Sequence, residues 1–319
     1  MKKVLKYFLI LLGIIVFLGV LGFAFIEIRG IPSYEVQKID YKVESSPIRV
    51  ERGKKLVSLL CEHCHKSSAT GKLTGSEMVE APAEFGKIFS QNITQDKKYG
   101  IGTWTDGEIL YLLRTGIKRD GKYAPPWMAK LPHMSDEDIS SIIAFLHSDD
   151  PLVTASETPD RPCEPSFLTK FLCLVAFKPF AMPDHKIEMP DTTNPAQLGK
   201  YLVHNLECYT CHSADFKTNN YLEPEKSKGY LGGGNKTLNQ DRKEIITQNL
   251  TPDPETGIGN WTEEQFVKAV KTGIVKDQPA LRYPMVPFVN LTDEEAKAIY
   301  AYLRTVPPLV HKVPRSAFD

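Results

Sequence analysis

The sequence predicts an all-α protein in which two copies of one helical unit follow an N-terminal transmembrane helix. Two observations support this fold class: an uncharged apolar stretch near the N-terminus, and an internal repeat at a constant spacing of 157 residues. The chain has 319 residues, which is enough for about two domains. Its 39 basic and 39 acidic residues cancel, and no basic run is interleaved with aromatic side chains, so no nucleic-acid partner is expected.

The apolar stretch runs from Tyr7 to Ile26, which is 20 residues without a charge. At about 1.5 Å per residue, a helix of this length crosses the roughly 30 Å hydrocarbon core of a bilayer. No convincing cleavage site follows it, so we favour a retained anchor over a cleaved signal peptide. Because Lys2, Lys3 and Lys6 precede the stretch, we expect the N-terminus in the cytoplasm and the remaining chain in the periplasm or the cell exterior.

The repeat indicates two copies of one domain. The segments that begin at Asn92 and Asn249 match without a gap, and the spacing of 157 is kept from Trp104 to Trp261. Two copies are too few for a solenoid. We therefore expect a membrane anchor at residues 1–30, a linker at 31–46, domains at 47–150 and 194–306, a connector at 151–193 and a C-terminal tail at 307–319.

Each copy is predicted to be helical. Capping-box patterns begin at Thr105 and Ser135 in the first copy and at Thr262 and Thr292 in the second. Apolar residues follow each of them at helical spacing, and no sustained alternation predicts a strand.

The connector carries seven prolines between residues 151 and 193, so we expect no long regular structure in it. Its apolar residues between Phe167 and Phe180 predict that it packs against one or both domains. Of the six cysteines, Cys163 and Cys173 are the two that lie outside residues 61–65 and 208–212. In an exported protein, an even number of remaining cysteines favours a disulfide between them over a pair of free thiols.

Two pentads carry the chemistry. Residues 61–65 and 208–212 each spell C-x-x-C-H, the pattern of covalent haem attachment. The two thiols can bond the two vinyl groups of one haem, and the adjoining imidazole can ligate its iron. Structural zinc would need four ligands close together, whereas the pentads are 147 residues apart, and a thioredoxin-like pair would need a βαβ context. The sequence predicts two haem c groups, held by Cys61, Cys64 and His65 and by Cys208, Cys211 and His212.

The sixth iron ligand decides between electron transfer and catalysis at an open iron. Met128 and Met285 occupy equivalent positions in proline-bearing loops, so we predict that they are the axial ligands. Met134 and His133 compete in the first copy, but their counterparts in the second are a leucine and an asparagine, which are unsuitable ligands.

Both units resemble class I cytochrome c domains, in which a first helix runs into C-x-x-C-H and a distal Met precedes a last helix. Segments 92–96, 100–105 and 135–138, with their counterparts 249–253, 257–262 and 292–295, are similar to those of multihaem cytochrome c subunits of membrane-bound alcohol and aldehyde dehydrogenases. The resemblance implies tandem class I cytochrome c domains and electron exchange with redox proteins, such as a dehydrogenase or a terminal oxidase.

The remaining candidates are weaker. Trp104 and Trp261 either direct an indole N–H toward a haem propionate or pack in the core. The three glycines at 232–234 lack the flanking residues of a phosphate-binding loop, so we interpret them as a plain loop. We predict an anchored, exported dihaem cytochrome that carries single electrons and is not itself an enzyme; the alternative is a dihaem peroxidase with one open haem.

Overall fold

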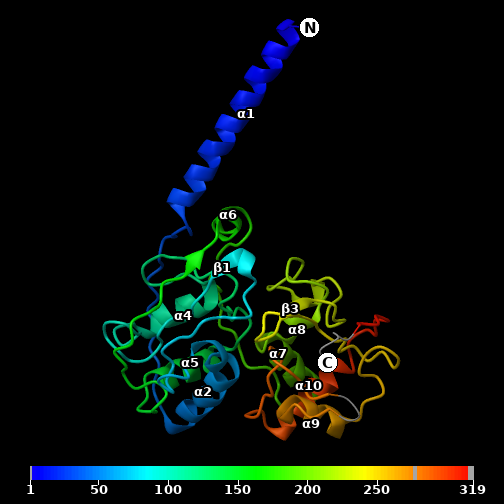
Figure 1. The fold of residues 1–319 in the computed structure, drawn as a ribbon. Coiled ribbons are helices and arrows are strands. Elements are labelled where there is room, and N and C mark those ends of the chain that lie inside the picture. Colours follow the sequence, from blue (N-terminus) through cyan, green and yellow to red (C-terminus); the bar gives the residue numbers. More distant parts are fainter. Residues whose placement is uncertain (1, 276–278, 315–319) are drawn as a thin grey trace.

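The structure is a computed structural model that describes residues 2–275 and 279–314, and it is mainly helical, as the sequence predicts (Figure 1). Short antiparallel pairings join β1 to β2 and β3 to β4. The elements are α1 (Lys2–Arg29), α2 (Pro47–Leu60), α3 (Glu62–His65), η1 (Ala83–Phe85), β1 (Gly86–Lys87), α4 (Asp106–Thr115), α5 (Asp136–Leu146), β2 (Glu164–Pro165), α6 (Phe167–Val175), α7 (Pro195–Asn205), α8 (Cys208–His212), η2 (Pro224–Lys226), β3 (Lys236–Leu238), β4 (Glu244–Ile246), α9 (Glu263–Thr272) and α10 (Asp293–Leu303).

The predicted anchor forms α1, which projects away from a body of two lobes (Figure 1). Its 28 residues are long and apolar enough to cross a membrane, and none of them is buried against the protein.

Each lobe is built on a close crossing between its first and last helices. In the first lobe α2 packs on α5, and in the second α7 packs on α10. Gly53 and Gly199 lie at the two crossings, where an added Cβ would overlap the carbonyl oxygens of Ser141 and Ala298. Only a residue without a side chain allows backbones to approach so closely.

The helix starts follow the predicted capping chemistry with one difference. Thr105, Thr262 and Thr292 each form a complete capping box. Ser135 accepts a hydrogen bond from the backbone N–H of Asp138 at 3.1 Å, but the Asp138 carboxylate does not return it. That carboxylate instead pairs with a guanidinium of α2 and accepts a hydrogen bond from a tyrosine of the second lobe.

Each lobe has its own hydrophobic core. The core of the first lobe is formed by side chains of α2, α4 and α5, and Ile39, Tyr41 and Val43 of the preceding segment pack against it. The core of the second lobe is formed by the corresponding helices α7, α9 and α10. Trp104 and Trp261 pack against these two cores, one against each, and are half-buried.

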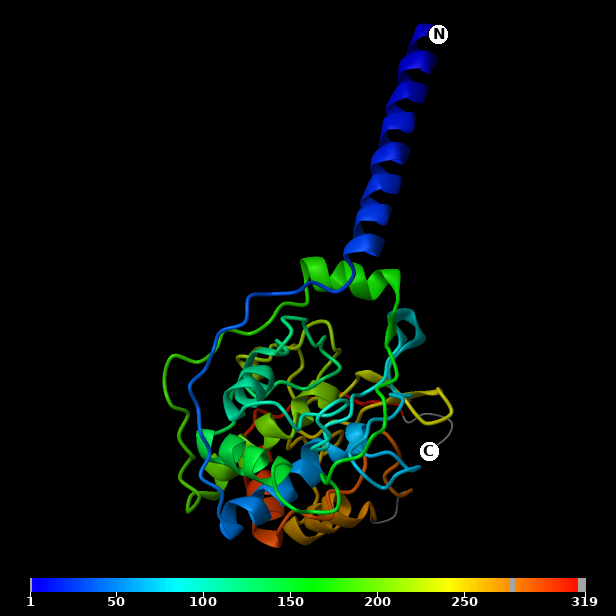
Figure 2. The same ribbon diagram turned by 90° about the vertical axis from the view of Figure 1, so that its left-hand side faces the viewer.

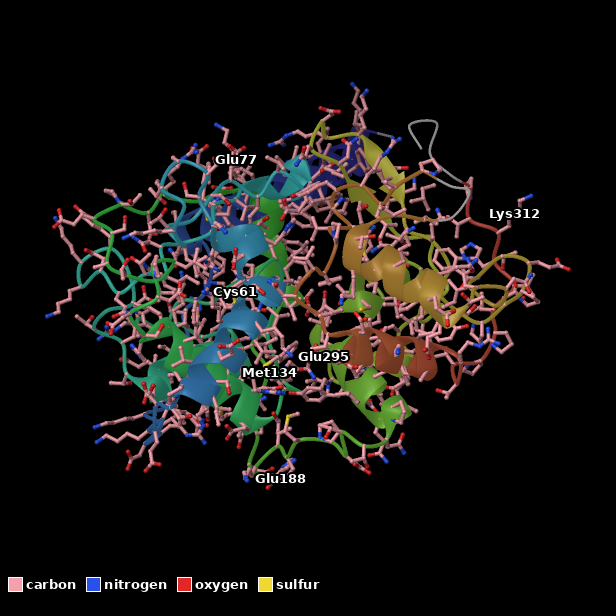
Figure 3. The ribbon with its side chains drawn as sticks, turned by 90° about the horizontal axis from the view of Figure 1, so that it is seen from below. Cys61, Glu77, Met134, Glu188, Glu295 and Lys312 are labelled. Atoms are coloured by element: carbon pink, nitrogen blue, oxygen red, sulfur yellow. The ribbon has the colours of Figure 1, made fainter. Side chains whose placement is uncertain are left out.

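The lobes are held together by polar contacts. The Lys55 ammonium lies 2.5 Å from the Glu295 carboxylate, and the Tyr201 hydroxyl donates to the Asp138 carboxylate at 2.6 Å. Viewed from below, Glu295 lies between the two lobes (Figure 3).

The connector contains more regular structure than its prolines predict. Ser166 caps α6 by accepting a hydrogen bond from the N–H of Thr169 at 3.2 Å, and nine helical residues follow. This short helix forms because the prolines flank the segment and leave its interior uninterrupted. The helix does pack against the first lobe, but through the buried Thr169 and Cys173. Four of the apolar residues predicted to pack are exposed instead: Phe167, Leu168, Phe171 and Val175.

The predicted disulfide between Cys163 and Cys173 is also wrong, since both are free thiols. Cys163 hydrogen-bonds the backbone of Phe89, accepting from its N–H at 3.3 Å and donating to its carbonyl at 3.2 Å. Cys173 lies on the buried side of α6. Because the helix begins between the two cysteines, it carries the second thiol away from the first.

The crossing predicts a strong effect of Gly53→Ala. The new methyl group overlaps the Ser141 carbonyl, so the helices must move apart, and we expect a loss of about 1–3 kcal/mol in the free energy of unfolding. Denaturant unfolding followed by circular dichroism measures it. Glu51→Ala, at an exposed position of the same helix, is the control; equal stability of the two variants would contradict the crossing.

Candidate haem-binding sites

Each predicted attachment pentad lies directly after the first helix of its lobe. In the first pentad the backbone N–H groups of Cys64 and His65 donate to the carbonyl of Cys61 at 3.2 and 2.8 Å. This tight turn places the two cysteines three positions apart on a helix, where side chains share a face. The second pentad forms α8, and two residues, Leu206 and Glu207, separate it from α7; Glu207 has a φ of 53°.

The two pentad histidines have the same hydrogen bond. The Nδ1 of His65 lies 2.7 Å from the carbonyl oxygen of Gln91, and the Nδ1 of His212 lies 2.8 Å from that of Gln248. A carbonyl oxygen can only accept, so each Nδ1 carries the proton. The Nε2 of each neutral ring is therefore the nitrogen with a lone pair for iron.

Burial supports these protonation states. It lowers the pKa of His65 and His212 and so favours the neutral imidazole. The hydrogen bond to the carbonyl has the opposite but smaller effect on the pKa. Burial raises the pKa of Cys61, Cys64, Cys208 and Cys211 to about 12, so these side chains are thiols at neutral pH.

The donor set fits covalently attached haem: paired free thiols and one oriented, neutral imidazole in each pentad. In the described part of the chain, no group of three or more His, Cys, Asp or Glu side chains could hold a metal ion.

The predicted axial methionines lie in loops close to the pentads. In the first lobe Trp127, the neighbour of Met128, packs in one apolar cluster with Cys64. The buried Lys130 stabilises this loop by donating to the Pro125 carbonyl at 2.8 Å, and burial lowers the pKa of Lys130 to about 7.

In the second lobe Met285 and Cys208 pack against the same core. The competing residues of the first lobe have other partners: Met134 is 1% exposed inside the first core, and the His133 Nε2 lies 3.0 Å from the Tyr221 carbonyl of the second lobe.

The loops that supply the carbonyls are held by two buried asparagines. Asn92 accepts from the N–H and hydroxyl of Thr94, and its amide donates to two carbonyls of the segment after α5. Asn249 accepts in the same way from Thr251 and donates to the carbonyl of Leu309, in the segment after α10, at 2.8 Å. The repeated Asn-x-Thr pattern thus fixes the loop next to each histidine partner.

The glycine run at 232–234 is a loop, as predicted, and it supports the second pentad. The N–H of Gly233 donates to the carbonyl of His212 at 2.8 Å. Gly233 and Gly234 have positive φ angles of 69° and 104°, which other residues rarely adopt.

A contact between lobes joins the two sites. The ring of His63, in the first pentad, stacks on Tyr283 with centroids 5.2 Å apart. Tyr283 lies two residues before Met285, and its hydroxyl donates to the Glu80 carboxylate of the first lobe.

One known protein family matches the chain, in two separate regions. The cytochrome c family model matches residues 50–149 and 196–307, one in each lobe. The chain belongs to the cytochrome c family. Membership implies covalently bound haem c, and the two pentads fall within the two matched regions.

Several curated relatives of this cytochrome c are named as cytochrome subunits of dehydrogenases. It is 30% identical to the fructose dehydrogenase cytochrome subunit of Gluconobacter japonicus, over 77% of this chain and 50% of that protein. It is 28% identical to the alcohol dehydrogenase (quinone) cytochrome c subunit of Gluconobacter oxydans, over 81% and 55%. The chain thus spans about half the length of these relatives. A diheme cytochrome c-type protein of Cereibacter sphaeroides is 27% identical, over 78% of this chain and 82% of that protein.

Sequence reasoning missed Gln91, Gln248, Lys130 and Tyr283. The two glutamines each precede the asparagine at which the recognised repeat begins, so extending the repeat by one residue would have included them. Their contribution is a backbone carbonyl, which no side-chain pattern reveals. Lys130 and Tyr283 depend on three-dimensional packing alone.

We predict that Asn92→Ala destabilises the first site. It removes an acceptor and a donor from a buried network and leaves its partners unpaired, at about 1–3 kcal/mol for each group. We expect lower stability in denaturant unfolding and a shifted reduction potential for one haem. Asn260→Ala, at an exposed asparagine, is the control; a variant as stable as this control would contradict the assignment.

Proposed function

We propose that this chain is a membrane-anchored dihaem electron carrier that relays single electrons on the outer side of the cytoplasmic membrane. The observation that carries the proposal is the pair of C-x-x-C-H pentads, in which each histidine is oriented by the corresponding loop carbonyl of its own lobe. Bound haem c supplies a one-electron iron couple.

The chain's own residues define the ligand set. The four pentad cysteines are the thioether attachment points, and His65 and His212 present Nε2 to the iron. Met128 and Met285 are proposed as the opposite ligands, and Met/His ligation raises the reduction potential. If His65 with Met128 and His212 with Met285 held the two haem irons, no ligand position would be left for a substrate, which favours a carrier over an enzyme.

Transfer between the two sites is supported by the stack of His63 on Tyr283. It gives a direct contact from the first pentad to the loop that contains Met285. We propose that electrons pass between the lobes near this contact.

The charges around α1 support the proposed side of the membrane. Lys2, Lys3 and Lys6 precede the apolar stretch, which favours a cytoplasmic N-terminus and exported lobes. The relatives named as dehydrogenase cytochrome subunits support a dehydrogenase as the electron donor.

The ligand proposal predicts distinct results for single methionine variants. Met128→Ala and Met285→Ala should each convert one haem, and only one, to an open or misligated form, because each removes one axial thioether. Optical and EPR spectra of the purified protein, with carbon monoxide binding to the reduced form, measure this change.

Met134→Leu is the matched control, since Met134 packs in a core and leucine has a similar volume. It should keep both haem spectra unchanged. Unaltered spectra in either alanine variant would refute that ligand. A high-spin haem in the unmodified protein that binds cyanide rapidly and turns over peroxide would support the dihaem peroxidase instead.

A further inference from the structure

Helix α6 has an unusual distribution of side chains. Its buried side carries Thr169 and Cys173, which are both 0% exposed. Its outward side carries Phe167, Leu168, Phe171 and Val175, which are between 37% and 56% exposed. A helix that faces water normally shows the reverse arrangement, with polar residues outward. The outward face of α6 is therefore suited to an apolar surrounding.

The position of α6 identifies that surrounding. Figure 2 shows α6 lying across the base of α1, and the rings of Phe23 and Phe167 stack with centroids 4.7 Å apart. Phe23 belongs to the uncharged stretch that ends at Ile26. Next to it, the Lys170 ammonium lies 2.5 Å from the carboxylate of Glu27, the first charge after that stretch. Helix α6 therefore lies at the same height along α1 as the end of its apolar stretch.

The same helix is fixed to the first lobe. The Thr169 hydroxyl donates to the Phe85 carbonyl at 2.8 Å, and the Ser166 N–H donates to the same carbonyl at 3.1 Å. The pairing of β1 with β2 secures the segment just before α6. A surface that holds α6 therefore also holds the first lobe.

We propose that the outward face of α6 lies in the interfacial layer of the lipid bilayer, as a second membrane contact that orients the first haem lobe. The inference rests on the proposed anchoring by α1. Interfacial helices lie in the membrane plane with their apolar side about 5–10 Å into the boundary layer, which matches a phenylalanine at the level of the last turn of the apolar stretch. Lys170 stays at the level of the headgroups, paired with Glu27.

The test uses nitroxide labels on the full-length holoprotein, with Cys163→Ser and Cys173→Ala to remove the free thiols. Leu168→Cys and Val175→Cys place labels near the two ends of α6. Val20→Cys is the reference in the apolar stretch of α1, and Leu222→Cys, at a 52% exposed leucine of the second lobe, is the reference in water. Unchanged haem spectra verify that each variant is folded.

Collision of the labels with oxygen and with a water-soluble nickel chelate is measured in nanodiscs of phosphatidylcholine and phosphatidylglycerol. We expect the oxygen-to-nickel accessibility ratio to be high at Leu168, Val175 and Val20 and low at Leu222. A low ratio on α6 with a high ratio at Val20 overturns the lipid contact and leaves the anchor intact. A low ratio at Val20 overturns the anchor itself. Protection of the α6 labels from both reagents indicates a protein occupant and also overturns the proposal.

Discussion

The close helix crossing in each lobe is the constraint on which the two sites depend. Gly53 and Gly199 let the first helix approach the last one until backbone meets backbone. Because the pentads begin one and three positions after the last residue of that first helix, the crossing also sets where each pentad lies. The loop of Gln91 or Gln248 then meets the histidine with nearly the same Nδ1 to oxygen distance in both lobes, 2.7 and 2.8 Å. The orientation of each imidazole is thus a consequence of backbone packing.

The two lobes keep this geometry while their surroundings diverge. The second has two extra residues before its pentad, Leu206 and Glu207, and it contains the hairpin of β3 and β4; burial raises the pKa of Glu207 to about 7. The first is linked to the apolar helix α1 through α6. Contacts such as Lys55 with Glu295 join the lobes, so two similar units form one body with one side turned toward α1 (Figure 1). This asymmetry supports the proposed relay, in which the two sites would exchange electrons with different partners.

Much of this organisation could be predicted from the sequence, because its signals are local. The repeat, the capping patterns and the C-x-x-C-H pentads each depend on a few neighbouring residues, and the helices lie where those patterns place them. The failures concern contacts between distant segments. Asp138 caps nothing because residues of α2 and α7 bind its carboxylate, and Cys163 and Cys173 remain apart because a helix begins between them. Likewise, the exposed apolar side of α6 becomes intelligible only when Phe167 is seen against Phe23.

The most direct test of the central claim is the intact mass of the full-length protein produced in a host that matures c-type cytochromes. The account predicts a polypeptide carrying two covalent haem additions, with peptide mapping assigning one to Cys61 and Cys64 and the other to Cys208 and Cys211. An unmodified polypeptide, or one with a single addition, would contradict it.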